Sequence, residues 1–179
     1  MIRLFVALDI PEAVSDRLSL LETGIPGARW TPSDNLHLTL RFIGEVNEAT
    51  ARDIDDVLST IRSAQFALSL SGLDTFGGRR PHALFIKTRP STELVHLQAK
   101  VDNALHRLGL TLEARKFVPH VTLARLRDVP EAKLAAFIQS ANLFDTGPFP
   151  VDGFCLFSSE LGEEGSTYFI ERRYPLQAA

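Results

Sequence analysis

The chain of 179 residues contains a single cysteine, Cys155, and no long hydrophobic segment. One cysteine cannot form a disulfide within the chain, which agrees with a reducing compartment. No apolar run approaches the roughly 20 residues that a membrane-spanning helix needs. The first residues, Met1–Asp9, pass directly into a strand-like segment and lack the basic start and cleavage site of a signal peptide. These absences favour a cytoplasmic protein.

A strong net charge and the usual cofactor motifs are also missing. The formal net charge of −3 argues against coating of nucleic acid, because non-specific duplex binding depends on many cations that neutralise phosphates. No glycine-rich loop of the Walker type indicates an ATP site. A zinc centre needs three or four ligands, often closely spaced, and no two histidines here lie four residues apart. We therefore expect no metal and no cofactor.

What the sequence does contain is a tetrapeptide that occurs twice. His37–Leu40 and His120–Leu123 both read His, apolar residue, Thr, Leu, and they start 83 positions apart (120 − 37). Each lies in a stretch of alternating apolar and polar residues, which is typical of a strand with one buried face. This period places His37 beside Thr39, and His120 beside Thr122, on one face of each strand. Two such strands facing each other would form a symmetric acid–base site.

The other three histidines lack this pattern. His82, His96 and His106 have no hydroxyl residue two positions later, and the last two lie on a predicted helix, where we expect them at the surface. A single histidine on a strand is more often structural than catalytic. Two copies in matched strand contexts favour catalysis by His37 and His120.

Periodicity predicts an α+β fold with mostly antiparallel sheets. No linker rich in glycine, proline or serine divides the chain, so we expect one bilobal domain over 1–179, with a duplicated architecture, a central cleft and helices outside. Residues 28–35 are rich in turn formers, and a further turn is expected at 162–165. The expected strands are 2–9, 36–44, 65–74, 82–88, 116–126, 149–158 and 166–173, and the expected helices are 11–22, 48–62, 91–108 and 130–140.

Strict alternation also assigns the remaining side chains of the two motif strands. It places Arg41 on the face of His37, and Phe42 on the opposite, apolar face. Counting from His120, it places Arg125 on the face away from the histidine, so that Arg125 reaches a cleft only through a bulge, a twist or the end of the strand.

Positive charge is clustered in spite of the acidic total. Any one cluster is most simply a solvated loop or strand edge, but two of the four flank the second tetrapeptide and favour a site for a small phosphate there. The clusters are Arg79-Arg80, Arg115-Lys116, Arg125 with Arg127, and Arg172-Arg173.

The residues around the two tetrapeptides resemble a known family. Arg29–Pro32 and Asn35–Val46 are similar to the first motif region of the two-histidine phosphoesterases, and Phe117–Arg125 is similar to the second. The segment Leu156–Leu161, with Tyr168 and Pro175-Leu176, resembles their closing hairpin. The branch that the chain resembles most is that of the bacterial and archaeal RNA 2′,3′-cyclic phosphodiesterases, first named 2′-5′ RNA ligases.

This resemblance implies a monomer that hydrolyses a 2′,3′-cyclic phosphate, on RNA ends or small nucleotides, to a 2′-phosphate without metal. A base must activate water and an acid must protonate the departing oxygen, and histidine, with a pKa near 6.5, can do either. By the resemblance, His37 is the proton donor and His120 the proton acceptor, although the near-symmetry of the motifs leaves this direction open. The hydroxyls of Thr39 and Thr122 can donate hydrogen bonds to the phosphate oxygens. Cleavage of 2′,5′ linkages, or slow ligation in reverse, belongs to the same chemistry.

Three further residues are candidates for substrate binding. Arg125 matches phosphate oxygens as a bidentate fork. Phe76 and Trp30 could stack on a nucleobase, with core packing as the alternative that we favour for Trp30. A module that binds RNA or nucleotides without catalysis remains the alternative function, but binding alone does not need two proton-transfer groups. A purely structural protein has only the general composition in its favour.

Overall fold

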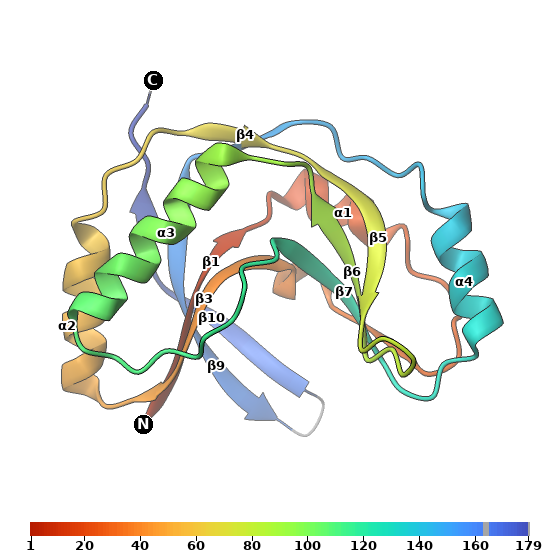
Figure 1. The fold of residues 1–179 in the computed structure, drawn as a ribbon, viewed down its shortest axis with the longest axis horizontal. Coiled ribbons are helices and arrows are strands. Elements are labelled where there is room, and N and C mark those ends of the chain that lie inside the picture. Colours follow the sequence, from red (N-terminus) through yellow and green to blue (C-terminus); the bar gives the residue numbers. More distant parts are fainter. Residues whose placement is uncertain (163–164, 179) are drawn as a thin grey trace.

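The computed structural model describes residues 1–162 and 165–178. Over this part of the chain it contains four helices, a short 3-10 turn and ten strands (Figure 1). No helix among these residues is long and apolar enough to cross a membrane. The helices are α1 (Glu12–Ser19), α2 (Glu48–Ser59), α3 (Thr92–Arg107) and α4 (Glu131–Ser140), and the turn is η1 (Ser33–Asn35). The strands are β1 (Ile2–Asp9), β2 (Ala28–Trp30), β3 (His37–Val46), β4 (Phe66–Leu68), β5 (Leu70–Phe76), β6 (Ala83–Thr88), β7 (His120–Leu126), β8 (Phe149–Val151), β9 (Gly153–Gly162) and β10 (Gly165–Pro175).

Eight strands form one sheet in the order β10-β9-β1-β3-β7-β6-β5, with β2 beside β7, and β4 and β8 form a separate pair. Every strand pairing is antiparallel, which confirms the predicted α+β class. Figure 1 shows the sheet curving between two groups of helices, with α2 and α3 side by side on one group of strands and α4 at the other end. The helices are therefore outside the sheet, as expected.

The two halves of the sheet meet where β3 pairs with β7. The pairing joins Leu38 to Val121, which are equivalent residues of the two tetrapeptides, so a local twofold axis passes between them. Both side chains are fully buried. Because neighbouring residues on a strand point to opposite faces, the histidine and threonine of both tetrapeptides share the other face. We call this the histidine face of the sheet.

Two of the helices, α1 and α3, are exchanged between the halves. Helix α3 follows β6 in the chain but packs on β3, where the Gln98 side chain donates to the Leu40 carbonyl at 3.5 Å. Helix α1 follows β1, but its Arg17 donates to the carbonyls of Thr146 and Asp145, beyond α4, at 2.6 and 2.8 Å. This exchange links the two halves through long-range contacts in addition to the shared sheet.

Trp30 of β2 packs as predicted. Its ring lies edge-on to Phe137 of α4, with centroids 5.7 Å apart, and its Nε1 donates to the Thr23 carbonyl at 3.0 Å. The indole belongs to the packing between β2 and α4 and to the edge of the core.

Several predicted boundaries are wrong. The turn-rich stretch contains the three-residue strand β2, and the long strand predicted at 65–74 is broken at Ser69 into β4 and β5. Strand β7 begins at His120 rather than at 116; the preceding residue is Pro119, which has no N–H for a ladder. Helix α1 ends at Ser19 instead of 22, because the N–H groups of Leu21 and Glu22 donate to the carbonyls three residues earlier instead of four. The turn predicted at 162–165 includes residues 163 and 164, which lie outside the described residues.

A bulge in β3 reverses the predicted faces of two residues. The register with β1 shifts after Thr39, so that Leu40 is an extra residue in the ladder. Arg41 therefore points to the helix side, where its Nε lies 2.9 Å from the carboxylate of Asp102 on α3. Phe42 turns to the histidine face and is half exposed there. The prediction that Arg41 shares the face of His37 is wrong, as is the apolar-face assignment of Phe42.

A matching bulge in β7 brings Arg125 to the histidine face. Thr122 pairs with Phe85, but Arg125 pairs with Ala83, so Leu123 is the extra residue. The alternation restarts after the bulge and returns the arginine to the face of His120. This is the bulge that the sequence required for Arg125 to reach the site.

The cap of α3 gives a stability prediction. The Ser91 hydroxyl accepts a hydrogen bond from the Leu94 N–H at 3.1 Å at the start of a helix that buries five residues in the core. We expect Ser91→Ala to lower the free energy of unfolding by about 1 kcal/mol in urea denaturation. Thr92→Ala changes the next, exposed residue and is the control. Equal losses in the two variants would contradict a capping role.

Candidate active site

The four motif side chains converge on the centre of the sheet. The Leu38–Val121 pairing, continued by one residue in each direction, sets Thr122 opposite His37 and Thr39 opposite His120. Directly opposed residues in an antiparallel pair have Cβ atoms about 4.5–5.5 Å apart. Each histidine therefore lies next to the threonine of its own strand and across from the threonine of the other. The predicted symmetric arrangement follows from a single register.

Both imidazoles are held in the same orientation. The Nδ1 atom of His37 lies 2.7 Å from the Asn35 carbonyl oxygen, and that of His120 lies 2.6 Å from the Val118 carbonyl oxygen. A carbonyl oxygen only accepts hydrogen bonds, so each Nδ1 carries the proton and donates it. In the neutral ring Nε2 is then the basic nitrogen, and in the charged ring it is the acid. The backbone two residues upstream thus selects Nε2 as the reacting atom in both motifs.

Aromatic rings enclose each imidazole in a similar way. One ring comes from the neighbouring strand of the sheet, and a second meets the imidazole edge-on. Phe76, predicted from the sequence as a stacking candidate, is the edge-on ring of His120, whereas Phe5 and Phe85 were missed because as strand residues they look like ordinary core. The centroid distances are 5.0 Å from His37 to both Phe5 and Tyr168, and 4.9 and 5.1 Å from His120 to Phe76 and Phe85.

This enclosure lowers the pKa of both imidazoles below the ordinary value of 6.5. For His37 burial is the main cause and the charge of His120 adds to it, while the bond to the Asn35 carbonyl acts in the opposite direction. For His120 burial again dominates and the bond to the Val118 carbonyl opposes it. Both rings therefore favour the neutral form until an anion binds between them.

The lowered pKa values predict how stability depends on pH. Below pH 6.5 the unfolded chain takes up protons before the folded chain does, so stability falls as the pH is lowered. We expect acidification from pH 7.5 to 5 to lower the melting temperature less in His37→Gln than in the parent protein. His96→Gln, which changes an exposed histidine of α3, is the matched control for loss of one histidine. An unchanged slope in His37→Gln would contradict the lowered pKa.

The second half of the histidine face is the more positive. Arg125 is exposed and lies directly across from Arg29 of β2, another exposed arginine. The equivalent of Arg125 in the first half, 83 residues earlier, is Phe42. Two opposed like charges destabilise a strand pair, and an anion between them would relieve the repulsion. The geometry thus agrees with the predicted phosphate-binding role of Arg125.

The other predicted clusters of positive charge divide into two groups. Arg172 and Arg173 of β10 and Arg115 make ion pairs with acidic side chains, and Arg127 has Asp128 beside it. Arg79 and Arg80 lie exposed in the loop after β5. Within residues 1–162 and 165–178 these two residues make no ion pair, and the same is true of Lys116 and Arg125. The charge left for an anion therefore lies around β7.

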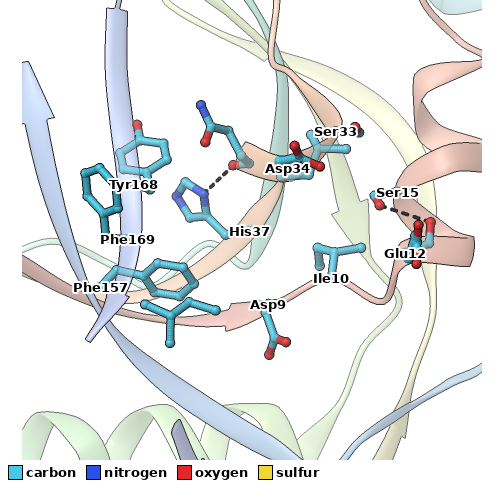
Figure 2. A pocket seen from close by; sticks show the side chains of 13 residues that line it. Asp9, Ile10, Glu12, Ser15, Ser33, Asp34, His37, Phe157, Tyr168 and Phe169 are labelled. Atoms are coloured by element: carbon cyan, nitrogen blue, oxygen red, sulfur yellow. Dashed lines mark hydrogen bonds between the residues drawn. The ribbon is translucent and has the colours of Figure 1, made fainter. Parts of the chain in front are cut away.

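A cavity of about 500 Å³ opens on the other side, next to His37 (Figure 2). Its walls come from the start of α1, from η1 and from the β9–β10 pair. Figure 2 shows Tyr168 and Phe169 on one side of His37, with Glu12 and Ser15 of α1 on the other. Within the part of the chain that the structure describes, no group of three or more histidine, cysteine or acidic side chains could hold a metal ion.

Comparison with known proteins identifies the family. The model of the 2′-5′ RNA ligase superfamily matches residues 17–163. The RNA 2′,3′-cyclic phosphodiesterase of Aeropyrum pernix is 33% identical over 168 residues, with 91% of this chain and 93% of the relative covered. The enzyme of the same name from Thermotoga maritima is 31% identical, with 94% and 92% covered. The crystal structure of E. coli LigT complexed with 3′-AMP has a TM-score of 0.80 and 26% identity, with 98% of each chain covered. On this match of sequence and fold, the chain belongs to the 2′-5′ RNA ligase superfamily.

Proposed function

We propose that this protein hydrolyses 2′,3′-cyclic phosphates at RNA ends, or on small nucleotides, to 2′-phosphates without a metal ion. The observation that carries the proposal is the pair of imidazoles on one face, both held through Nδ1 and both with Nε2 left to react. The activity named for the relatives from Aeropyrum and Thermotoga supports it. His37 is the proton donor and His120 the proton acceptor, as the family resemblance implies.

The two histidines account for the proton transfers. His120 Nε2 takes a proton from water, the water oxygen forms a bond to phosphorus, and the bond from phosphorus to the ribose 3′-oxygen breaks. Protonated His37 gives its Nε2 proton to the 3′-oxygen, which leaves phosphorus as a hydroxyl group. The phosphate stays on the 2′-oxygen. The burial that lowers the pKa of His120 keeps it neutral as a base. The negative phosphate favours the protonated form of His37.

The remaining predicted residues bind the phosphate and the RNA. Thr39 and Thr122 donate to the non-bridging oxygens, where negative charge grows as the new bond forms. Arg125 adds a guanidinium on the same face. Phe76 lies with one face on Phe85, at 4.1 Å, and is placed on the His120 side, where it can contact a neighbouring base of an RNA chain. Both motif strands come from one chain, so we propose a monomer, and the single buried cysteine agrees with the cytoplasm.

The direct test is hydrolysis of a 2′,3′-cyclic nucleotide in excess chelator, with the product isomer identified by chromatography. We expect turnover that the chelator leaves unchanged and a 2′-phosphate as the product. A rate that disappears with chelator and returns with a divalent cation would overturn the metal-free mechanism. Binding without turnover would make the site a recognition module.

A further inference from the structure

The cavity beside His37 belongs to only one of the two halves. It reaches His37 but not Thr39, His120 or Thr122. The two motifs are otherwise nearly symmetric. The cavity therefore makes the surroundings of a bound phosphate different on its His37 side and on its His120 side. What occupies it follows from the chemistry at His37.

The group that His37 protonates is the 3′-oxygen of the ribose that carries the cyclic phosphate. The ribose must therefore lie on the His37 side of the phosphate, and the attacking water on the His120 side, in line with the departing oxygen. The base is attached to the same ribose. A cavity of about 500 Å³ next to His37 is well placed for that base, and this step rests on the function proposed above.

Three carboxylates, those of Asp9, Glu12 and Asp34, are among the polar groups that line the cavity. Asp9 is neutralised by Arg173, whose guanidinium lies 2.5 Å from it. Glu12 and Asp34 are exposed, and within residues 1–162 and 165–178 neither carboxylate makes an ion pair or a side-chain hydrogen bond. Ionised carboxylates only accept hydrogen bonds, and they repel phosphates. The cavity therefore suits an uncharged group that carries hydrogen-bond donors.

The wall opposite these carboxylates is aromatic. Tyr168 meets His37 edge-on, and Phe169, the next residue of β10, is 45% exposed. Figure 2 shows both rings beside His37, across the cavity from α1. Proteins that bind single-stranded nucleic acids stack aromatic side chains on the bases. Their polar side chains distinguish one base from another by hydrogen bonds to its Watson–Crick edge. The combination fits a nucleobase.

We propose that this cavity binds the base of the terminal nucleotide and prefers guanine, with Glu12 and Asp34 as the acceptors. Guanine presents two adjacent donors, N1–H and the N2 amino group, which match the two oxygens of a carboxylate. Adenine and cytosine place an acceptor next to their amino group, and uracil has a single N–H between two carbonyls. A bidentate pair with a carboxylate therefore forms only with guanine.

The test compares kcat/KM for the 2′,3′-cyclic phosphates of guanosine, adenosine, cytidine, uridine and inosine, in chelator. Inosine lacks only the N2 amino group of guanosine. We expect guanosine to exceed inosine by about tenfold, mainly through KM, because one hydrogen bond to a charged group is lost. Glu12→Gln and Asp34→Asn replace one acceptor oxygen by a donor, and at least one of them should remove the preference. Asp16→Asn removes a carboxylate from the same helix outside the cavity lining and is the control.

The outcomes separate this inference from the proposed function. Hydrolysis of all five substrates at similar rates would overturn the guanine site and leave the phosphodiesterase intact. A guanosine preference that survives in both variants would overturn the assignment of Glu12 and Asp34. If none of the five is hydrolysed, the proposed function fails and the inference fails with it.

Discussion

Replacing either His37 or His120 with alanine should lower kcat for 2′,3′-cyclic phosphate hydrolysis by about 10³-fold, since each removes one of the two proton transfers. Initial rates in excess chelator measure the effect. KM should change much less, because Thr39, Thr122 and Arg125 still bind the phosphate.

Two comparisons make this result specific. His82→Ala changes an exposed histidine just before β6 and should leave kcat near that of the parent protein. The double variant of His37 and His120 should lose little more than either single variant, because residues that act as a unit in one step have non-additive effects. A single variant that keeps a tenth of the parent kcat would contradict acid–base catalysis by that residue.

The repeated tetrapeptide made the central features of the fold predictable. A spacing of two residues between His and Thr fixes their common face locally, without knowledge of any partner strand. The helices were predicted for the same reason, since the apolar spacing of α3 and its serine cap are local patterns. These predictions needed only the residues within one element.

The predictions that were wrong depend on contacts between elements. Arg41 and Phe42 follow the bulge at Leu40, and the sequence of β3 alone does not reveal where β1 fails to match it. Arg125 reached the histidine face through the bulge at Leu123, which exists only in the register with β6. A bulge shifts every later residue of a strand to the other face, so one unseen register change reverses several assignments.

The surroundings of the histidines could not be predicted either. His37 packs against Phe5 and Tyr168, which are far from it in the chain and come from two other strands. The cavity next to His37 combines α1, η1 and β10, three elements that are separate in the sequence and meet only in the folded chain. Local patterns identified the reacting atoms, but the pKa values and the shape of the substrate site are set by long-range packing.

The second large effect should come from the two threonines. We expect Thr39→Val and Thr122→Val each to lower kcat about 10²-fold, as the loss of one donor to a developing oxyanion does in other enzymes. Valine has the shape of threonine and suits a strand, so the fold should be retained. Over the described residues neither hydroxyl has a hydrogen-bond partner in the protein, so a purely structural role would leave kcat almost unchanged. Thr→Ser at each position should restore most of the rate.

The double threonine variant tests the geometry itself. Thr39 lies opposite His120 and Thr122 opposite His37, so the two hydroxyls approach the phosphate from different strands. If each donates to its own non-bridging oxygen, the two losses should multiply to about 10⁴-fold, since independent sites are additive in free energy. If both donate to one oxygen, the second substitution should cost much less than the first. Multiplicative losses would indicate that the local twofold axis of the sheet passes between the two non-bridging oxygens of the bound phosphate, so that each threonine binds one of them.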